Sequence, residues 1–442
     1  MNKINKVAIF GMGKSGKAAL RLAKKFKQDF YVVNRGDPKS WWESEQLGDI
    51  CGICSCYSED DFSQHFHTMD EIVLSPGIPV THPALMKAVA KGVPIISEVE
   101  YAYRYTKNTP LIAITGTNGK TTTTTMIAQA LKMAGKKVFC GGNIGIPFCD
   151  LAVSHEQVDF AIIEVSSFQL ETIKEFHPKI GLILNIFPNH SERYDDVHDY
   201  ARAKFRMLIN MTSEDQLILG TENPYLSDIQ DHPASKIYFT KGSLPEEFKG
   251  LFDFSKSHAK GEHNEANFFA AYEVLRLLGI PDLHPLFQNF INTFPGVAHR
   301  LEFVLEKDGL TLYNDAKSTN SLATTTAIKA FKDSAVPLYL ILGGKLRNES
   351  DKLLPDLLPY KDKITKIFTI GDVTERLYEE LVLHFEVERA QDLKTVFEKC
   401  KKLKGNLVFS PAFPSFDQFK NYVDRGEKFK AWAHEAFNIN SH

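Results

Sequence analysis

The stretch Leu111–Thr125 (LIAITGTNGKTTTTT) holds the residues whose types and spacing are best suited to chemistry. An apolar run ends in Gly116–Thr121 (GTNGKT), and a segment with helical spacing continues to Leu131. The glycines let backbone N–H groups turn inward around a phosphate, the lysine adds a positive charge, and the last threonine can ligate a Mg²⁺ held by that phosphate. The strict pattern G-x-x-x-x-G-K-[ST] is not met, because Ile114 occupies its first glycine position. The sequence therefore predicts a shortened phosphate-binding loop, with a plain strand-to-helix turn as the alternative.

Polar residues also follow other apolar runs in this part of the chain. Glu164 closes the run that begins at Phe160 and precedes Ser166–Leu170, while Asn185–His190 follows the run from Ile180. In an open α/β sheet, ligands bind beyond the carboxyl ends of the strands. We therefore expect these side chains to share one edge of a mainly parallel sheet with the glycine loop.

Lys204 differs from the other charged residues of the segment Val197–Ile209. Helical spacing places it on one stripe with Val197, Ala201 and Leu208. A lysine on an apolar face must extend its ammonium to solvent, pair with another group, or be chemically altered. Spacing alone favours the first interpretation, a snorkelling lysine.

A later helix carries two asparagines in its first turn. Asn264 and Asn267 are spaced i, i+3 in a helix predicted to reach Leu278, so their side chains share a face. Helix capping explains one of them, whereas a common ligand explains both.

The N-terminal part begins with a strand and a glycine turn of another kind. Val7–Phe10 is predicted to be a buried strand, and Gly11–Gly16 matches the G-x-G-x-x-G turn of dinucleotide-binding folds. The next strand ends at Asn34-Arg35, where a nicotinamide-dinucleotide site usually has an acid. Because that acid is missing, the turn favours the phosphates of another nucleotide. Ser75-Pro76-Gly77, after the run Ile72–Leu74, fixes a loop at the same edge.

The C-terminal part alternates strands and helices again, with a polar cluster after three of its strands. These clusters are Asp315–Asn320, Gly343–Lys345 and Ser410–Gln418. Helix caps and turns are the alternative explanation, but Lys317 and Lys345 at one edge indicate an anionic substrate.

The bulk properties limit the class of protein. A chain of 442 residues suggests three domains at about 150 residues each. Hydrophobic residues make up 43% and charged residues 24%, as in soluble globular proteins. The net charge of −3 gives no case for nucleic acid or an anionic membrane as a partner. The sequence has no signal-like apolar core and no run long enough to span a membrane, so we expect a cytoplasmic protein.

Six cysteines in so long a chain predict reduced thiols rather than a disulfide framework. Cys51, Cys54 and Cys56 lie close together in the sequence, with His65 and His67 downstream, so a structural zinc site is the alternative. The histidines are too close together for a zinc finger and no second C-x-x-C follows, which favours ordinary thiols.

Taken together, these motifs resemble those of the Mur ligases of bacterial peptidoglycan synthesis, in order and over all three parts of the chain. The resemblance rests on Gly116–Thr121, Glu164–Leu170, Asn185–His190, Gly261–Asn267, His299-Arg300, Asp315–Asn320, and Ser410–Phe419 with Arg425-Gly426. The C-terminal motif SPAFPSFDQF is similar to that of the branch of the family that adds D-glutamate.

The resemblance implies an α/β fold of three domains. A Rossmann-like domain at residues 1–107 would bind the UDP substrate, and a central P-loop-type ATPase domain with a mainly parallel sheet at residues 108–297 would bind ATP. A C-terminal Rossmann-like domain at residues 298–442 would bind the amino acid. The implied reaction is the ATP-dependent addition of D-glutamate to UDP-N-acetylmuramoyl-L-alanine through an acyl phosphate, with release of ADP and phosphate. We expect a monomer.

Three other functions are weighed against this one. Another ligase of the superfamily, with a different amino-acid specificity or a folylpolyglutamate synthetase-like activity, is the nearest alternative. A dehydrogenase with an appended ATPase-like domain is opposed by the neutral Asn34. A non-catalytic nucleotide sensor is opposed by the intact set of chemical residues after the strands.

The resemblance also assigns residues to each ligand. The expected catalytic residues are Lys120, Glu164, His190 and Lys204. Those expected at ATP are Gly116, Thr117, Asn118, Gly119, Lys120, Thr121, Thr122, Asn264, Asn267, Arg300 and Asp315. Those expected at the UDP substrate are Gly13, Lys14, Ser15, Asn34, Arg35, Ser75, Pro76, Gly77, Asn143, Ser166 and Gln169. Those expected at D-glutamate are Lys317, Thr319, Lys345, Ser415, Phe416 and Tyr422.

Two Mg²⁺ ions are implied, with Thr121, Glu164, His190 and Lys204 as protein ligands. In this family the lysine at the position of Lys204 is carbamylated by CO₂. A carbamate removes the cost of a buried ammonium and supplies a carboxylate-like ligand. With the resemblance in view, a functional Lys204 is therefore favoured over a snorkelling one.

Three positions depart from the family pattern. Asn189 stands where an aspartate is frequent, so one acidic group near the metals is missing. Gly343-Gly344-Lys345 lacks the residues that usually separate the glycines from the lysine. Tyr422 replaces a frequent phenylalanine and adds a hydroxyl to the expected D-glutamate pocket.

Overall fold

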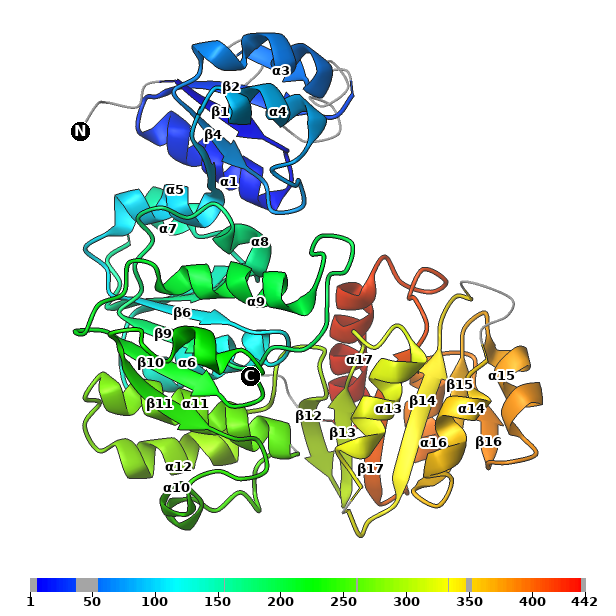
Figure 1. The fold of residues 1–442 in the computed structure, drawn as a ribbon. Helices are drawn as coiled ribbons and strands as arrows, with labels where there is room; N and C mark the ends of the chain where they lie inside the picture. The colour runs from blue at the N-terminus through cyan, green and yellow to red at the C-terminus, as the bar shows by residue number, and fades with distance from the viewer. Residues whose placement is uncertain are drawn as a thin grey trace. The chain divides into compact units, whose positions relative to one another are not determined.

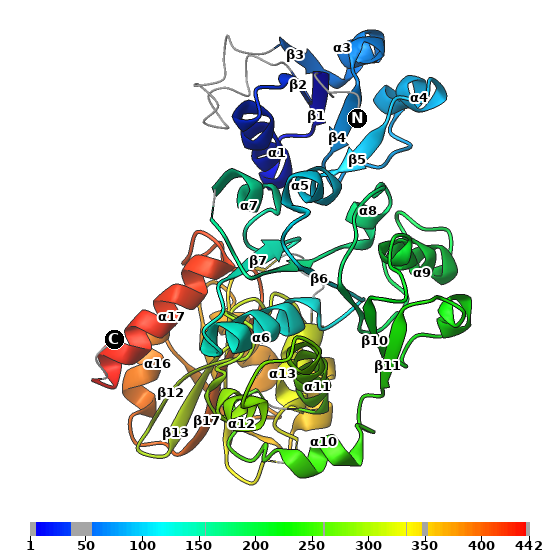
Figure 2. The same cartoon turned by 90° about the vertical axis from the view of Figure 1, so that its left-hand side faces the viewer.

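The chain forms three β-sheets with helices packed on them (Figures 1 and 2). The computed structural model describes residues 6–36, 55–154, 156–259, 261–332, 334–346 and 352–438. The chain divides into two compact units, residues 1–251 with 266–287 and residues 252–265 with 288–442. The first two sheets belong to the first unit and the third sheet to the second. The predicted α/β class is confirmed, while the domain limits stay a prediction.

The first sheet is parallel throughout, in the order β3-β2-β1-β4-β5. Its strands are β1 (Lys6–Phe10), β2 (Asp29–Asn34), β3 (Ser55–Ser58), β4 (Glu71–Leu74) and β5 (Ile95–Ser97), and its helices are α1 (Lys14–Lys25), α3 (Glu59–His65), α4 (Pro83–Ala90) and α5 (Glu98–Thr106). Val7 and Ile9 pack on the α1 side, whereas Ala8 and Phe10 pack on the side of α3 and α4. The winding reverses at β1, which leaves its glycine turn where such sheets bind ligands.

The second sheet is also parallel, in the order β11-β10-β9-β6-β8-β7. Its strands are β6 (Leu111–Thr115), β7 (Val138–Gly142), β8 (Phe160–Glu164), β9 (Ile180–Ile183), β10 (Gln216–Gly220) and β11 (Ser235–Phe239). The helices of this region are α6 (Lys120–Met133), α7 (Cys149–Ser154), α8 (Ser167–Leu170), α9 (Val197–Phe205), α10 (Glu246–Leu251), α11 (Glu262–Leu277) and α12 (Leu283–Thr293). Every residue of β6 is buried, and this strand lies between β8 and β9. The carboxyl ends of these three strands are therefore adjacent, as the sequence predicted.

The third sheet has the order β12-β13-β17-β14-β15-β16, and only the β12–β13 pair is antiparallel. Its strands are β12 (Glu302–Lys307), β13 (Leu310–Asn314), β14 (Leu338–Gly343), β15 (Ile364–Ile370), β16 (Val387–Arg389) and β17 (Gly405–Ala412). Its helices are α13 (Ser321–Lys329), α14 (Leu354–Leu357), α15 (Thr374–Leu381), α16 (Leu393–Cys400) and α17 (Tyr422–Ala436). One core cluster joins the sheet to α13, α14 and α15, and another joins it to α16 and α17. Figure 1 labels these helices. Because β17 lies between β13 and β14, the three polar clusters after these strands are neighbours.

The sequence patterns missed some elements. They did not predict the short or edge strands β3, β12 and β16, nor helix α5. Strands of three or four residues carry too little alternation to be recognised without their neighbours. Cys51 and Cys54 lie outside the described residues, and Cys56 lies in β3, where it is half-buried. None of the described helices is long and apolar enough to cross a bilayer.

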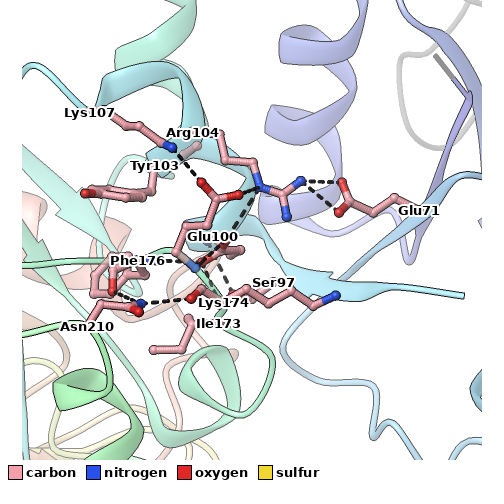
Figure 3. A network of polar contacts seen from close by, with 12 residues as sticks. Glu71, Ser97, Glu100, Tyr103, Arg104, Lys107, Ile173, Lys174, Phe176 and Asn210 are labelled. Carbon is pink, nitrogen blue, oxygen red and sulfur yellow. Dashed lines mark hydrogen bonds and ion pairs between the residues drawn. The ribbon is translucent and has the colours of Figure 1, made fainter. Parts of the chain in front are cut away.

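Helix α5 joins the first sheet to the second through a buried polar network (Figure 3). Arg104 donates two hydrogen bonds to the carboxylate of Glu71 in β4, at 2.9 and 2.8 Å. Glu100 is fully buried, and its carboxylate accepts backbone N–H groups from Lys174, Glu175 and Phe176. Buried charges persist only when they are paired in this way. The network therefore fixes the chain that follows α8.

Candidate active site

The phosphate-binding loop predicted after β6 is a closed turn. Gly116 and Gly119 have positive φ angles of 148° and 82°, which an L side chain rarely adopts, and α6 begins directly afterwards at Lys120. The Lys120 Nζ folds back and donates to the carbonyl oxygens of Gly116 and Thr117, both at 2.8 Å. The loop thus combines a helix N-terminus with a fixed positive charge, which suits an anionic ligand.

Asn185 holds this loop from the neighbouring strand. Its side-chain oxygen accepts the N–H of Asn118 at 2.8 Å, and its side-chain nitrogen donates to the Asn118 carbonyl at 3.2 Å. Its backbone oxygen accepts the N–H of Thr117. Sequence reasoning gave the segment Asn185–His190 a place at the sheet edge but gave Asn185 no role. The signal available was its position directly after an apolar run.

Glu164 lies beside the loop, at the end of β8, and is only 2% exposed. Its carboxylate accepts the Thr121 hydroxyl at 2.9 Å and the Asn143 side-chain amide at 2.8 Å. The structure therefore brings together the predicted metal ligands Thr121 and Glu164. Asn143, predicted to contact the UDP substrate, orients this carboxylate.

Lys204 does not extend to solvent, so the snorkelling interpretation is wrong. The residue is 1% exposed, and its Nζ donates to the Gly116 carbonyl at 3.0 Å and lies 4.4 Å from the centre of the Tyr200 ring. The loop carbonyl and the aromatic face replace water as partners of the amine. Burial lowers the pKa of Lys204 well below its usual range. The positive charge of Lys120 lowers this pKa further, whereas the negative charge of Glu164 raises it.

His190 follows β9 in a strained conformation. Its φ angle of 57° is left-handed, and its N–H donates to the side-chain oxygen of Asn189, so the asparagine that departs from the family pattern serves the local turn. The ring packs edge-on against Phe168 and Tyr200, with centres 4.7 and 5.9 Å apart. Its Nδ1 lies 2.9 Å from Glu192, which leaves Nε2 as the atom for a metal.

The α8 region supplies two of the residues predicted for the UDP substrate. Ser166 and Gln169 form a capping box: the Ser166 hydroxyl accepts the Gln169 N–H, and the Gln169 side-chain oxygen accepts the Ser166 N–H. Helix capping therefore accounts for the Ser166 hydroxyl and for the Gln169 side-chain oxygen. The Gln169 Nε2 is buried and has no hydrogen-bond partner among the described residues. A buried amide donor in this state suits a ligand oxygen.

The first sheet gathers the other residues predicted for the UDP substrate at one edge. The Met12 N–H donates to the Asn34 side-chain oxygen at 3.4 Å, and the Ser75 hydroxyl donates to the Gly11 carbonyl at 2.9 Å. Asn34 therefore supports the glycine turn from the position where a dinucleotide site has its acid. The remaining residues lie on the same loops or at the start of α1, half-buried or exposed: Gly13, Lys14, Ser15, Arg35, Pro76 and Gly77.

The predicted ATP contacts outside the loop have different surroundings. Asn267 is 7% exposed and accepts the Thr123 hydroxyl of α6 at 3.1 Å, while Asn264 is half-buried at the start of α11. Asp315 accepts the Ser410 hydroxyl at 2.7 Å and the Leu301 N–H at 3.1 Å, and burial raises its pKa to about 7. Thr122 lies in the first turn of α6, and Arg300 is exposed before β12.

The third sheet brings most of the predicted D-glutamate residues to one edge. The Lys317 Nζ lies 5.5 Å from the centre of the Tyr422 ring, and the Lys345 N–H donates to the Pro414 carbonyl at 2.8 Å. Ser415 is buried beside it, Phe416 is 65% exposed, and Thr319 is half-buried on the turn after β13.

Arg425 belongs to one of the motifs that resemble the family, but the sequence predicted no role for it. It is 1% exposed and donates to the carbonyls of Phe413 at 2.9 Å and Ala316 at 2.8 Å. It thereby ties the loop after β17 to the loop after β13. A buried arginine cannot be recognised from the sequence letters alone.

The oxygen ligands of the candidate site fit Mg²⁺ better than a transition metal. Thr121 and Glu164 supply a hydroxyl and a carboxylate, the hard oxygen ligands that Mg²⁺ prefers. In the part of the chain that the structure describes, no three His, Cys, Asp or Glu side chains are grouped to hold a metal ion.

Comparison with known proteins gives concordant results. Residues 114–275 match the Mur ligase middle domain, and residues 5–97 match the Mur ligase MurD-like N-terminal domain. The chain is 34% identical to the UDP-N-acetylmuramoylalanine–D-glutamate ligase of Caldicellulosiruptor saccharolyticus, over 97% of this chain and 98% of that protein. It is 35% identical to the enzyme of the same name from Streptococcus uberis, over 96% of this chain and 95% of that protein. The MurF ligase of Thermotoga maritima, solved with ADP, has the same fold, with a TM-score of 0.55, 13% identity and full coverage of both chains.

Proposed function

The chain belongs to the Mur ligase family, and on that ground we propose that it joins D-glutamate to UDP-N-acetylmuramoyl-L-alanine with conversion of ATP to ADP and phosphate. This assignment is supported by 34% and 35% sequence identity to two D-glutamate ligases over nearly the full length of the chain. The reaction is a step in the synthesis of peptidoglycan precursors. We place it in the cytoplasm, where ATP is made, with the protein acting as a monomer.

The loop after β6 is assigned to the phosphates of ATP. Phosphoryl transfer needs positioning and neutralisation of charge rather than covalent help from the protein. The bonds from Lys120 to two loop carbonyls keep an ammonium across the loop, and the first N–H groups of α6 point the same way. Asn264, Asn267, Arg300 and Asp315 are the proposed contacts for the rest of the nucleotide.

The metal ligands are assigned to two Mg²⁺ ions. Bound Mg²⁺ would neutralise charge on the phosphoryl oxygens as the carboxylate of the UDP substrate is phosphorylated to an acyl phosphate. Thr121 and Glu164 are the ligands proposed for one ion. His190 and a carbamate on Lys204 are those proposed for the other.

The surroundings of Lys204 support its modification by CO₂. A carbamate forms when a neutral amine attacks CO₂ and loses a proton, so a lysine that holds its proton weakly is the reactive form. Burial and the neighbouring Lys120 favour that neutral form. The resulting anion would supply the acidic metal ligand that the unmodified side chains lack.

The other two sheets are assigned to the remaining substrates. The edge formed by the Gly11–Gly16 turn, Asn34 and Ser75 is proposed to hold the uridine diphosphate, with Asn143, Ser166 and Gln169 near the sugar and peptide. The edge that carries Lys317 and Lys345 is proposed to hold the two carboxylates of D-glutamate.

An amino-acid panel tests the reaction. Phosphate release should require ATP, UDP-N-acetylmuramoyl-L-alanine and D-glutamate together. L-Lysine, meso-diaminopimelate and L-alanine should each give less than a tenth of the rate. Equal rates with any of these would make the protein a ligase of another specificity.

Chemical rescue tests the carbamate. Lys204→Ala should lose phosphate release and regain part of it when acetate or another short-chain carboxylate is added, because the added anion can occupy the space of the missing ligand. Lys204→Arg, which keeps the charge but cannot be carbamylated in the same way, should remain inactive. The absence of rescue at every carboxylate concentration would count against the carbamate.

A further inference from the structure

The chain between Glu164 and Phe176, called the junction below, connects three of the segments that carry proposed metal ligands. These are the end of β8 with Glu164, the turn at His190, and α9 with Lys204. The junction begins with one proposed ligand, Glu164, and continues through α8 into a loop without regular structure. Two further proposed ligands, His190 and Lys204, lie on separate segments further along the chain. Each of those segments is bonded to this junction by a side chain that the proposed reaction does not use.

Glu171 makes the first of these connections. Its carboxylate accepts the Arg193 Nε at 3.1 Å and the Tyr194 hydroxyl at 2.7 Å, and it also pairs with the Arg193 Nη2. The backbone N–H groups of Arg193 and Tyr194 both donate to the carbonyl of His190, at 2.9 and 3.1 Å. One carboxylate therefore holds the C-terminal end of the turn that begins at His190, which has a left-handed φ.

The surroundings of Glu171 favour a strong connection. The side chains of Glu171 and Arg193 are only 16% and 13% exposed, so this pair is much better shielded than a surface ion pair. The Arg193 guanidinium also lies 4.9 Å from the centre of the Phe168 ring, against whose edge His190 packs. Arg193 thus contacts His190 directly through its backbone N–H. It also contacts Phe168, the ring that packs edge-to-face with His190.

Arg206 makes the second connection. It follows Lys204 closely in the chain and donates to the carbonyls of Leu170 at 3.0 Å and Ile173 at 2.9 Å. These carbonyls lie on either side of Glu171. The end of α9, with Lys204 on it, is therefore bonded to the same short segment.

The junction itself is held from outside the site. The three backbone N–H groups that Glu100 accepts belong to Lys174, Glu175 and Phe176, directly after the segment gripped by Arg206 (Figure 3). Asn210 donates to the carbonyls of Lys174 and Phe176 at 2.8 and 3.1 Å. A segment fixed on this side can act as a rigid reference for the elements bonded to its other side.

We propose that Glu171 and Arg206 are positioning residues for metal binding: through the junction they set the places of His190 and Lys204 relative to Glu164. This inference rests on the proposed function for the identity of the ligands. Groups that orient metal ligands typically change metal affinity by about 10- to 100-fold when they are replaced.

Mn²⁺ binding tests the inference without turnover. Glu171→Gln, which keeps the volume but loses the charge, and Arg206→Lys, which loses the paired donors, should each weaken Mn²⁺ binding by about tenfold in electron paramagnetic resonance titrations. Amide hydrogen exchange of residues 186–196 should become faster in Glu171→Gln. Asp199→Asn is the matched control. It breaks an ion pair with Arg202 at the surface of α9, the helix that carries Lys204.

The outcomes separate this inference from the proposed function. Unchanged Mn²⁺ affinity and unchanged exchange in both variants would overturn the inference, whatever their thermal stability. If Glu171→Gln fails to fold, Tyr194→Phe and Arg193→Lys apply the same test with less disturbance. A wild-type protein that binds Mn²⁺ but releases no phosphate with D-glutamate would overturn the proposed function, while the variants would still decide the positioning role.

Discussion

The first and second sheets both begin with a buried strand, a glycine turn and a helix, but neutral side chains support the first turn, whereas a lysine bonds across the second. After β6, Lys120 crosses the loop and Asn185 pins it from the next strand. After β1, the turn is supported by the Asn34 amide and the Ser75 hydroxyl, and Lys14 is exposed.

The difference shows that a glycine turn by itself specifies a backbone shape and not a chemistry. Both turns can approach a phosphate closely at their glycines, which have no side chain. A turn that merely holds a nucleotide needs neutral donors. A turn that assists transfer of a phosphoryl group also needs fixed positive charge and metal ligands. The second turn has the charge in Lys120, with Thr121 and the neighbouring Glu164 as the proposed ligands.

The lysines of the two turns should differ most. Lys120→Ala should lower phosphate release by about a thousandfold or more, because it removes a fixed charge at the transferred group. Lys14→Ala should raise the KM for the UDP substrate by less than about tenfold and leave kcat nearly unchanged, as expected for an exposed charge. Steady-state kinetics of both variants checks the comparison, and similar losses in the two would refute it.

Among the glycines, Gly119 should be the more sensitive for activity. Its φ is 82°, and a Cβ there would lie 2.8 Å from the Asn267 side-chain oxygen. Gly119→Ala should therefore weaken ATP binding by roughly 10- to 100-fold, from strain on the order of 1–3 kcal/mol. Titration with a fluorescent ATP analogue measures this, and an affinity within threefold of wild type would show that the loop tolerates a side chain.

Gly16 should matter for stability instead. A Cβ at this position would lie 1.9 Å from the Gly11 carbonyl oxygen, so the turn or α1 would have to move. Gly16→Ala should reduce the free energy of unfolding by about 1–3 kcal/mol, as overpacking does, with an unchanged KM for ATP. Urea unfolding monitored by circular dichroism provides the measurement. A stable variant with impaired ATP binding would reverse the roles given to the two turns.

The smallest effect is expected at Asn34. Asn34→Asp keeps an oxygen for the Met12 N–H but adds a negative charge near the proposed diphosphate. The KM for the UDP substrate should rise by about two- to fivefold, the size of an exposed charge interaction. A fluorescence titration should detect no NADH binding in either form. NADH binding by the variant would mean that the first turn is a dinucleotide site that lacks only its acid.

The edge of the second sheet could be predicted from the sequence because parallel strands present their carboxyl ends on one side. The apolar runs before the glycine loop, Glu164 and Asn185 were long enough to identify as strands, and their polar endings marked the edge. The same reasoning located the three clusters of the third sheet. It could not give the strand order, which places β17 between β13 and β14.

The roles of single side chains were harder to predict. The burial of Lys204 depends on the Gly116 carbonyl, which another segment supplies, as well as on the ring of Tyr200 one turn earlier in α9, so its spacing on the helix was a poor guide. Asn185 and Arg425 act through hydrogen bonds to distant backbone groups, for which a sequence has no local signal. Asn189 looked like a missing metal ligand, but its side chain bonds to the His190 N–H.

The Gln169 Nε2, which has no hydrogen-bond partner among the described residues, should influence which ligands bind. A buried donor without a partner costs about 1–3 kcal/mol, and this cost is present in the protein before any ligand arrives. A molecule that offers an oxygen to the Gln169 Nε2 relieves the cost, whereas a molecule of the same shape with a methylene there leaves it in place. The protein should therefore discriminate between two such compounds by roughly 5- to 150-fold, the affinity ratio that corresponds to this energy. In inhibitor design, an acceptor at this point would gain affinity by pairing with a buried donor that has no partner among the described residues.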